Sequence, residues 1–205
     1  MRLFNHVFNA LNRCRIQILL VFAVYTLSVT IGIIMSQTGN NFALIYRDKI
    51  VGQSLSTDKA SINYLKGNNF SAALYDFKGN LLFGAIPQTL MAFSIVIPFI
   101  TVAKQGWVGG IVSVDGEHKS RFKNLNSLLY YIIVLLGQLI PYSMAIGAGM
   151  KCGIDFYTAN RTIGWDIRKF KIPKTSLIDV GYIYILVIPL FFLASCFEFL
   201  SSWNM

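Results

Sequence analysis

Residues that could do chemistry are few in this sequence of 205 residues, and they lack the spacing that catalysis or metal binding requires. The two histidines, His6 and His118, lie outside the long apolar runs, and the three cysteines form no CxxC pair. The sequence has no HExxH or GxSxG motif, no paired aspartates within an apolar run and no glycine-rich phosphate loop with its lysine. We therefore expect no enzymatic activity, no cofactor and no metal ion.

Glu198 is the only acidic residue well inside an apolar run, which makes it the first candidate for an interaction site. A carboxylate at membrane depth is costly unless it has a partner or faces a water-filled cavity. One interpretation is a polar contact with an arginine, a glutamine or the backbone of another element or subunit. The other is that Glu198 lies at headgroup depth, because it is seven residues from the last residue, Met205.

A glycine-rich segment ends the second apolar run and is the next candidate. It contains Gln105, Gly106, Gly109 and Gly110. Its glycines could let an unwound backbone line a cavity. Equally, the segment could be a tight turn at the membrane surface, with Trp107 anchored in the interface.

The third apolar run contains the remaining candidates. Gln138 and Pro141 interrupt its middle, and they predict a break there. Ala145, Gly149 and Gly153 recur every four residues, so they share one helix face that another helix could approach closely. That helix could belong to the same chain or to another subunit.

These candidates must be positioned by membrane-spanning elements. The chain is 55% apolar and only 13% charged, with a mean hydropathy of +0.56. A helix needs about 20 apolar residues to cross a bilayer, and four runs approach or exceed this length: 16–35, 80–103, 127–150 and 178–200. The sequence therefore predicts an all-α, polytopic transmembrane helical bundle in one integral membrane domain, residues 1–205.

The first thirteen residues predict a short amphipathic helix on the membrane surface. Apolar side chains recur there at helical spacing, and Arg2 and Arg13 lie among the polar ones. The net charge of +9 fits such a position, because the basic residues flank apolar runs where anionic headgroups attract them. Nothing in the sequence matches a nucleic-acid-binding motif, so we expect no nucleic-acid partner.

The distribution of Lys and Arg predicts the topology. If 127–150 re-enters the side from which it came, thirteen of the eighteen basic residues lie on the side of the N-terminus. The positive-inside rule then places the N-terminus in the cytoplasm. We therefore expect a broken or re-entrant third element. The main alternative, an inverted bundle of four simple spans, has eleven basic residues inside.

Four short motifs accompany the apolar runs: Asn80 with Gly84, Gln105-Gly106-x-x-Gly109, the small-residue stretch 145–153, and the segment 194–199 that contains Glu198. Together they resemble the stage II sporulation protein M family of bacterial membrane proteins. The family commonly carries a His-Gly and a Glu ahead of the small-residue stretch. Here the corresponding region reads Gly137-Gln138, so no role of those two residues transfers to this chain.

The resemblance implies a non-catalytic integral membrane subunit that scaffolds or recruits partners in a complex of the bacterial inner membrane. Relatives accompany ABC-type exporters, including those that handle bacteriocins, so the alternative is a permease-like subunit of such an exporter. The expected partners are membrane lipids and other membrane or membrane-associated subunits, such as a separate ABC ATPase or a cell-wall hydrolase. A homo- or hetero-oligomer is expected.

Overall fold

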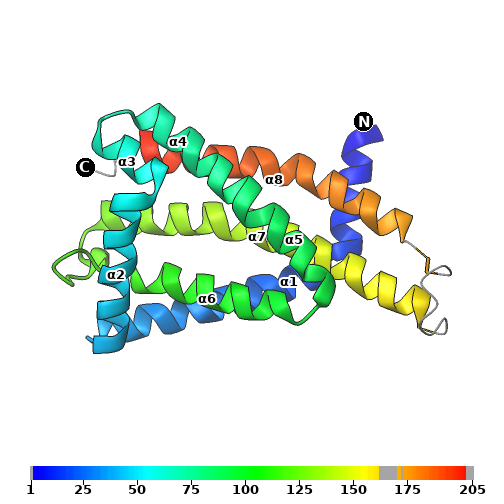
Figure 1. Cartoon of the computed structure of the whole chain (residues 1–205), viewed down its shortest axis with the longest axis horizontal. Coiled ribbons are helices and arrows are strands. Elements are labelled where there is room, and N and C mark those ends of the chain that lie inside the picture. Colours follow the sequence, from blue (N-terminus) through cyan, green and yellow to red (C-terminus); the bar gives the residue numbers. More distant parts are fainter. Residues whose placement is uncertain (1, 162–169, 172, 202–205) are drawn as a thin grey trace.

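Three long helices form the framework of the molecule. The computed structural model describes residues 2–161, 170–171 and 173–201. Within these residues α1 (Arg2–Gln37), α7 (Leu125–Asn160) and α8 (Lys174–Leu200) are each long and apolar enough to cross a membrane. Figure 1 shows α7 and α8 following the long axis of the molecule. The described part contains helices and no strand, so the predicted all-α bundle is confirmed.

Helix α1 includes the segment that was expected to form a separate surface helix. The prediction of an independent helix over 1–13 is wrong, because α1 continues without a break from Arg2 to Gln37. Its first turns nevertheless point away from the rest of α1 (Figure 1). Phe4 and Phe8 are exposed there, whereas Val7 is buried in the bundle. The apolar face of these turns is thus divided between the protein and its surroundings.

The second apolar run belongs to a helical hairpin, which sequence reasoning did not foresee. The hairpin consists of α4 (Asn69–Lys78), a π-helical segment η1 (Gly79–Ala85), α5 (Ile86–Met91), a 3₁₀ turn η2 (Ala92–Ser94) and α6 (Ile97–Ile111). Figure 1 shows α4 to α5 running in one direction along the bundle and α6 returning, with the two arms diverging from the turn. The re-entrant element of this chain is therefore its second apolar run.

The hairpin turns where the sequence interrupts its hydrogen bonds. Pro87 and Pro98 were expected to bend a single helix, but they lie in the first turns of α5 and α6. A proline is tolerated there, because the first turn of a helix has no intrahelical acceptor for its N–H. Between the two helices Ile95 adopts a φ of +66°. This left-handed conformation is rare for a β-branched residue, and it reverses the chain.

The predicted break in the third apolar run is wrong. Helix α7 passes through Gln138 and Pro141 without interruption. Pro141 removes one backbone hydrogen bond, but a membrane helix tolerates this loss when its neighbours pack around it. The residues from Pro141 to Met150 are all buried. The Gln138 amide also has a partner, described below, so no unpaired polar group forces the helix apart.

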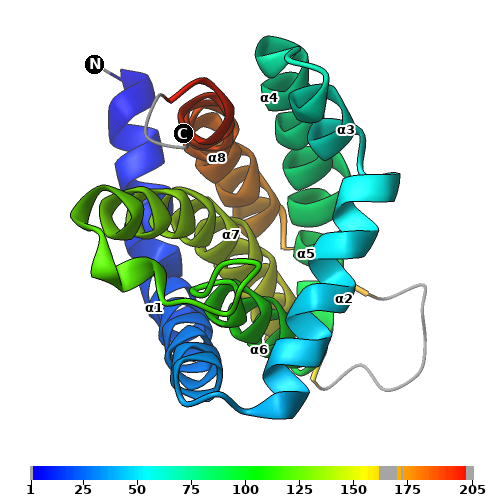
Figure 2. The ribbon, with the colours of Figure 1, turned by 90° about the vertical axis from the view of Figure 1, so that its left-hand side faces the viewer.

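The polar connection 36–78 is more ordered than expected. It contains α2 (Asn41–Thr57) and α3 (Lys59–Leu65) before α4 begins. The Asn40 side chain caps α2 by accepting from the Ala43 N–H, and Asp58 caps α3 by accepting from the Ser61 N–H. Figure 2 shows α2 lying across the end of the bundle at which α6 finishes. Tyr46 of α2 packs there on the ring of Trp107.

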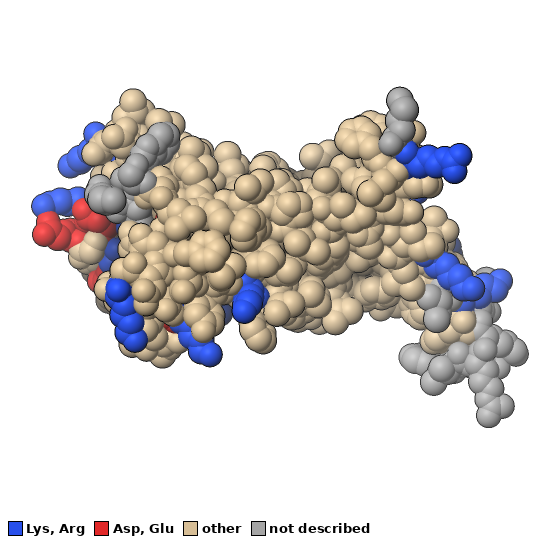
Figure 3. All heavy atoms as spheres, turned by 90° about the horizontal axis from the view of Figure 1, so that it is seen from above, with Lys and Arg blue, Asp and Glu red and all other residues tan. Residues whose placement is uncertain are grey.

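The charged residues mark two ends of the molecule. On the face shown in Figure 3, Lys, Arg, Asp and Glu lie mainly toward the ends, and a broad uncharged zone separates them. We call the end with the start of α1 the N-terminal end. There Arg13 of α1 forms an ion pair of 2.5 Å with Asp179 of α8. The opposite end holds α2, α3 and the connection 112–124, which includes the turn η3 (Arg121–Lys123).

This arrangement changes the count of basic residues. Because α7 runs from one end to the other, Ser120 and the connection between α7 and α8 lie at opposite ends. The segments at the N-terminal end contain nine Lys and Arg, and those at the opposite end contain eight. Arg168 and Lys169 of the basic connection lie outside the described residues. Lys104 belongs to neither end, because it lies within α6.

Candidate functional site

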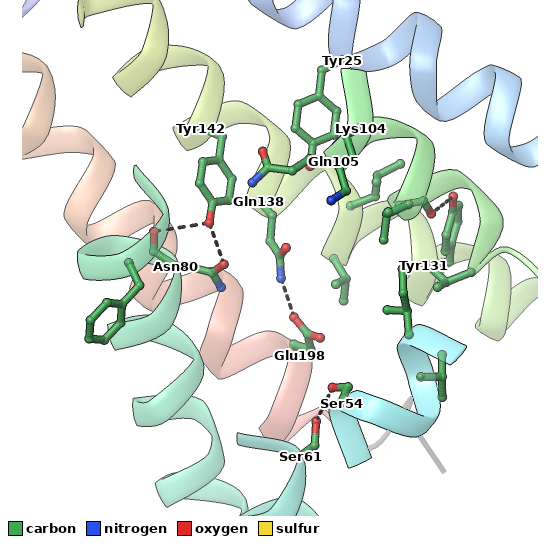
Figure 4. A pocket seen from close by; sticks show the side chains of 18 of the residues that line it. Tyr25, Ser54, Ser61, Asn80, Lys104, Gln105, Tyr131, Gln138, Tyr142 and Glu198 are labelled. Carbon is green, nitrogen blue, oxygen red and sulfur yellow. Dashed lines mark hydrogen bonds between the residues drawn. The ribbon is translucent and has the colours of Figure 1, made fainter. Parts of the chain in front are cut away.

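A cavity of about 850 Å³ lies between the two arms of the hairpin. Helix α7 contributes many of its lining side chains, and α2 and the end of α8 contribute others. Figure 4 shows polar side chains from these elements pointing into one space. The volume falls within the range of about 300–1,000 Å³ that is typical of ligand pockets.

Glu198 lies in this cavity and has a partner from another helix. Its Oε2 accepts a hydrogen bond of 2.8 Å from Nε2 of Gln138 in α7. Tyr130 of α7 donates to the Glu198 backbone carbonyl, also at 2.8 Å. Of the two interpretations of Glu198, the geometry therefore matches the polar contact. The partner lies within the same chain.

The π-helical segment η1 forms a second polar group at the wall of the cavity. The Tyr142 hydroxyl lies 2.9 Å from Oδ1 of Asn80 and 3.3 Å from its backbone carbonyl. Gly84 makes room for this hydroxyl, because a Cβ at Gly84 would overlap it. π-Helical turns leave backbone carbonyls without their usual partners and occur frequently at functional sites. Here Tyr142 supplies a donor to one of them.

Two amide oxygens of the cavity lining are buried without a hydrogen-bond donor. They are Oε1 of Gln88 in α5 and Oε1 of Gln105 in α6. The Gln88 side chain belongs to a residue that is only 6% exposed. Because an unpaired buried acceptor costs about 1–3 kcal/mol, both oxygens favour a ligand that donates hydrogen bonds.

Cationic groups also face the cavity. The Lys104 side chain extends into it from the middle of α6 (Figure 4) and forms no ion pair with any described residue. Arg121 lines the cavity near its outer end, and its Nε is buried without an acceptor. A charged group at membrane depth normally has a counter-charge or faces water. The cavity thus combines positive donors with unpaired acceptors.

Four of the ten predicted candidates meet in this cavity: Gln105, Gly109, Gln138 and Glu198. The segment that contains the first two is neither a turn nor an unwound chain, because it lies inside α6. Gly106 and Gly110 face away from the cavity and pack against α1. A Cβ at Gly106 would lie 2.6 Å from the Tyr25 carbonyl oxygen. The glycines of this segment therefore serve close packing and the cavity at once.

The other predicted candidates lie beyond the cavity, in the buried half of α7. Pro141 and Ala145 are buried in the helical core. Gly149 and Gly153 face the turn of the hairpin, and a Cβ at Gly153 would lie 2.6 Å from the Phe93 carbonyl oxygen. The small-residue face thus packs within this chain and holds the hairpin turn in place.

Sequence reasoning missed three residues of the cavity. Lys104 was counted as a loop residue, because the apolar run was taken to end at Ala103. Gln88 and Tyr142 were not singled out, although both are polar residues inside apolar runs. Such positions signal a buried polar site, and the signal is easily lost beside the prolines next to them. Among the described residues no group of three or more His, Cys, Asp or Glu could hold a metal ion.

The lining can bind a ligand but lacks the parts of a catalytic site. Glu198 has an amide partner, and no hydroxyl or thiol of the described lining bonds to a base. Donors and acceptors converge on an otherwise apolar cavity, which is the arrangement of a binding site for a polar or amphipathic molecule. Comparison with protein-family models, curated proteins and solved structures finds no match.

Proposed function

We propose that this protein is a non-catalytic integral membrane subunit that binds a ligand in its hairpin cavity. We place it in a complex of the bacterial inner membrane, together with other membrane or membrane-associated subunits. The observation that carries the proposal is the convergence of Lys104, Gln138 and Glu198 in one cavity between apolar spans. The resemblance to the stage II sporulation protein M family remains a prediction, and it is consistent with a role as a subunit.

Of the two functions that the sequence left open, the cavity favours the permease-like subunit over the scaffold. A scaffold needs only surfaces, and unpaired polar groups inside it would lower stability without benefit. A permease needs a place for its substrate. Polar residues inside a membrane protein mark such places. The ATPase of the exporter would then be a separate protein.

Purification in mild detergent from the native membrane tests this proposal. Co-elution of an ATP-binding cassette protein supports the permease-like subunit, whereas co-elution of a cell-wall hydrolase alone supports the scaffold. Val108→Trp fills the cavity from α6 and should abolish function while leaving the complex assembled. Ile100→Trp is the matched control on the same helix, because Ile100 is 68% exposed. Equal function of the two variants would contradict a role for the cavity.

We further propose that the N-terminal end faces the cytoplasm. The N-terminal segment carries Arg2, Arg13 and Arg15 beside exposed apolar residues, and the cytoplasmic leaflet attracts such basic segments. In a chain without its native cysteines, Asn5→Cys and Ser120→Cys should label from opposite sides of the membrane. Asn5→Cys should react only when reagents reach the cytoplasm. The reverse pattern would invert the orientation, and labelling of both from one side would contradict the spanning α7.

A further inference from the structure

The unpaired groups of the cavity specify the chemistry of its occupant. The positive donors are Lys104, which has no ion-pair partner among the described residues, and Arg121, with its unsatisfied Nε. Both face a space bounded by apolar helices, where water screens charge poorly. A ligand that neutralises them carries an anionic group with several acceptor oxygens, as a phosphate does.

The acceptors of the cavity require a donor on the same ligand. Gln88 and Gln105 each present a buried, unpaired amide oxygen. Glu198 uses Oε2 to accept from Gln138, and its other oxygen bonds to no described residue. A carboxylate beside two carbonyl-type acceptors is suited to a primary ammonium, which has three donors and a positive charge. The head of the ligand is therefore zwitterionic.

The rim of the cavity is apolar and open. Phe83 of η1 is 82% exposed, Leu55 of α2 is 48% exposed and Met91 of α5 is 39% exposed, although all three line the cavity. In the direction of these residues the arms of the hairpin diverge (Figure 1). A ligand whose head occupies the polar part can thus extend an apolar tail over this rim toward the surrounding lipid.

We propose that the cavity binds an amphiphile with a phosphate and a primary ammonium in its head, the chemistry of an aminophospholipid. The phosphate pairs with Lys104 and Arg121, the ammonium lies among Glu198, Gln88 and Gln105, and the acyl tail leaves past Phe83. This inference rests on the proposed ligand-binding function and names the class of the ligand.

The test is a binding competition on the full chain in maltoside micelles. A fluorescent phosphatidylethanolamine is displaced by four probes: dihexanoyl phosphatidylethanolamine, dihexanoyl phosphatidylglycerol, dihexanoyl glycerol and tail-free phosphoethanolamine. The first should compete about tenfold better than each of the others, because each of them lacks the ammonium, the phosphate or the tail.

Variants assign the two charges of the head. Lys104→Gln should weaken binding of phosphatidylethanolamine about tenfold, and Lys104→Arg should restore most of it. Lys123→Gln is the control for the loss of one positive charge, because Lys123 is exposed and lies outside the cavity lining. Glu198→Gln should remove the preference for phosphatidylethanolamine over phosphatidylglycerol. Gel filtration shows whether each variant is folded.

The outcomes separate this inference from the proposed function. Equal competition by dihexanoyl glycerol or by phosphatidylglycerol overturns the zwitterionic head, but leaves a ligand-binding cavity. Tail-free phosphoethanolamine that competes as well as the lipid identifies a soluble ligand and overturns the amphiphile. If the fluorescent lipid binds Val108→Trp as well as it binds the unmodified chain, the cavity holds no ligand of this kind, and the proposed function loses its support as well.

Discussion

The two sides of α6 differ in what they contact. On one side Gly106 and Gly110 bring the helix against the backbone of α1, where Gly32 faces Gly110. We call these three residues the glycine seam. On the other side Lys104 and Gln105 face the cavity. Close backbone packing is a main source of stability between membrane helices, where no hydrophobic effect drives association. The glycine seam therefore stabilises α6 sufficiently for its other side to remain unpacked.

The largest effect is expected from a bulky residue in the glycine seam. Gly110→Leu places a side chain where a Cβ already overlaps the Val29 carbonyl. We expect destabilisation of about 3 kcal/mol or more, because backbone cannot yield as a side chain can. Unfolding in mixed micelles measures it. Gly181→Leu is the control, since nothing lies within 4 Å of a Cβ at Gly181. Similar stability of the two variants would show that the seam is not tightly packed.

A second bulky substitution separates the hairpin turn from α7. A Cβ at Gly149 would overlap the Thr89 carbonyl, so Gly149→Leu should displace α5 and open the far end of the cavity. We expect a loss of about 2 kcal/mol, smaller than in the seam because the turn is a short element. Spin labels at Ile95 and Thr158 should report a longer and broader distance. An unchanged distance with unchanged stability would contradict this contact.

A smaller change sharpens the comparison on the cavity side. Gly84→Ala should cost about 1 kcal/mol, because its methyl group displaces the Tyr142 hydroxyl from Asn80. Tyr142→Phe removes the hydroxyl and should make the second substitution nearly neutral. Unfolding free energies of the two single variants and of the double variant form the test. Additive effects would mean that Gly84 and Tyr142 do not interact.

The hydrogen bond of Glu198 should contribute less again. Polar pairs in membrane proteins contribute about 0.6 kcal/mol on average. Glu198→Gln keeps an acceptor for Gln138, so its stability should stay close to that of the unmodified chain. Glu198→Leu should lose about this amount, with a larger loss of ligand retention or partner recovery. Recovery of both variants at the unmodified level would make Glu198 a residue of the membrane boundary.

The smallest expected effect is that of pH on α2, which covers the outer end of the cavity. The Arg47 hydrogen bond, together with His118, holds the pKa of Asp48 in α2 below its usual range. The stabilisation is therefore present above the usual carboxyl range and is lost as the pH falls through the lowered value. Amide exchange in α2 should rise at acidic pH relative to the rest of the chain. Asp48→Asn should abolish that difference, and a difference that persists would assign it to another group.

Length and composition were sufficient to predict the helical class and three of the long apolar helices. They failed at the hairpin, because proline is ambiguous in sequence. Pro141 signals a break but lies in a continuous helix, whereas Pro87 and Pro98 start new helices around the turn. The difference comes from the surroundings of each proline. Tertiary packing buries Pro141, and Ile95 reverses the chain between the other two.

Part of the candidate site could also be predicted. Glu198, Gln138 and Gln105 stood out as polar residues within or beside apolar runs, and they meet in the cavity. Their meeting could not be predicted, because it depends on where α8 ends relative to the middle of α7. Lys104 was missed because one residue beyond the apolar run looks like a loop. The continuation of α6 to Ile111 places it inside instead.

The turn of the hairpin has a consequence for passage through the protein. The cavity lining reaches Gln88 and Met91 of α5 but includes none of the small residues from Ala145 to Gly153. The chamber is therefore blind toward the N-terminal end, and the seated turn is its floor. A molecule that crossed the protein would have to unseat this floor, so the contact at Gly149 and Gly153 would be the gate of an alternating-access cycle.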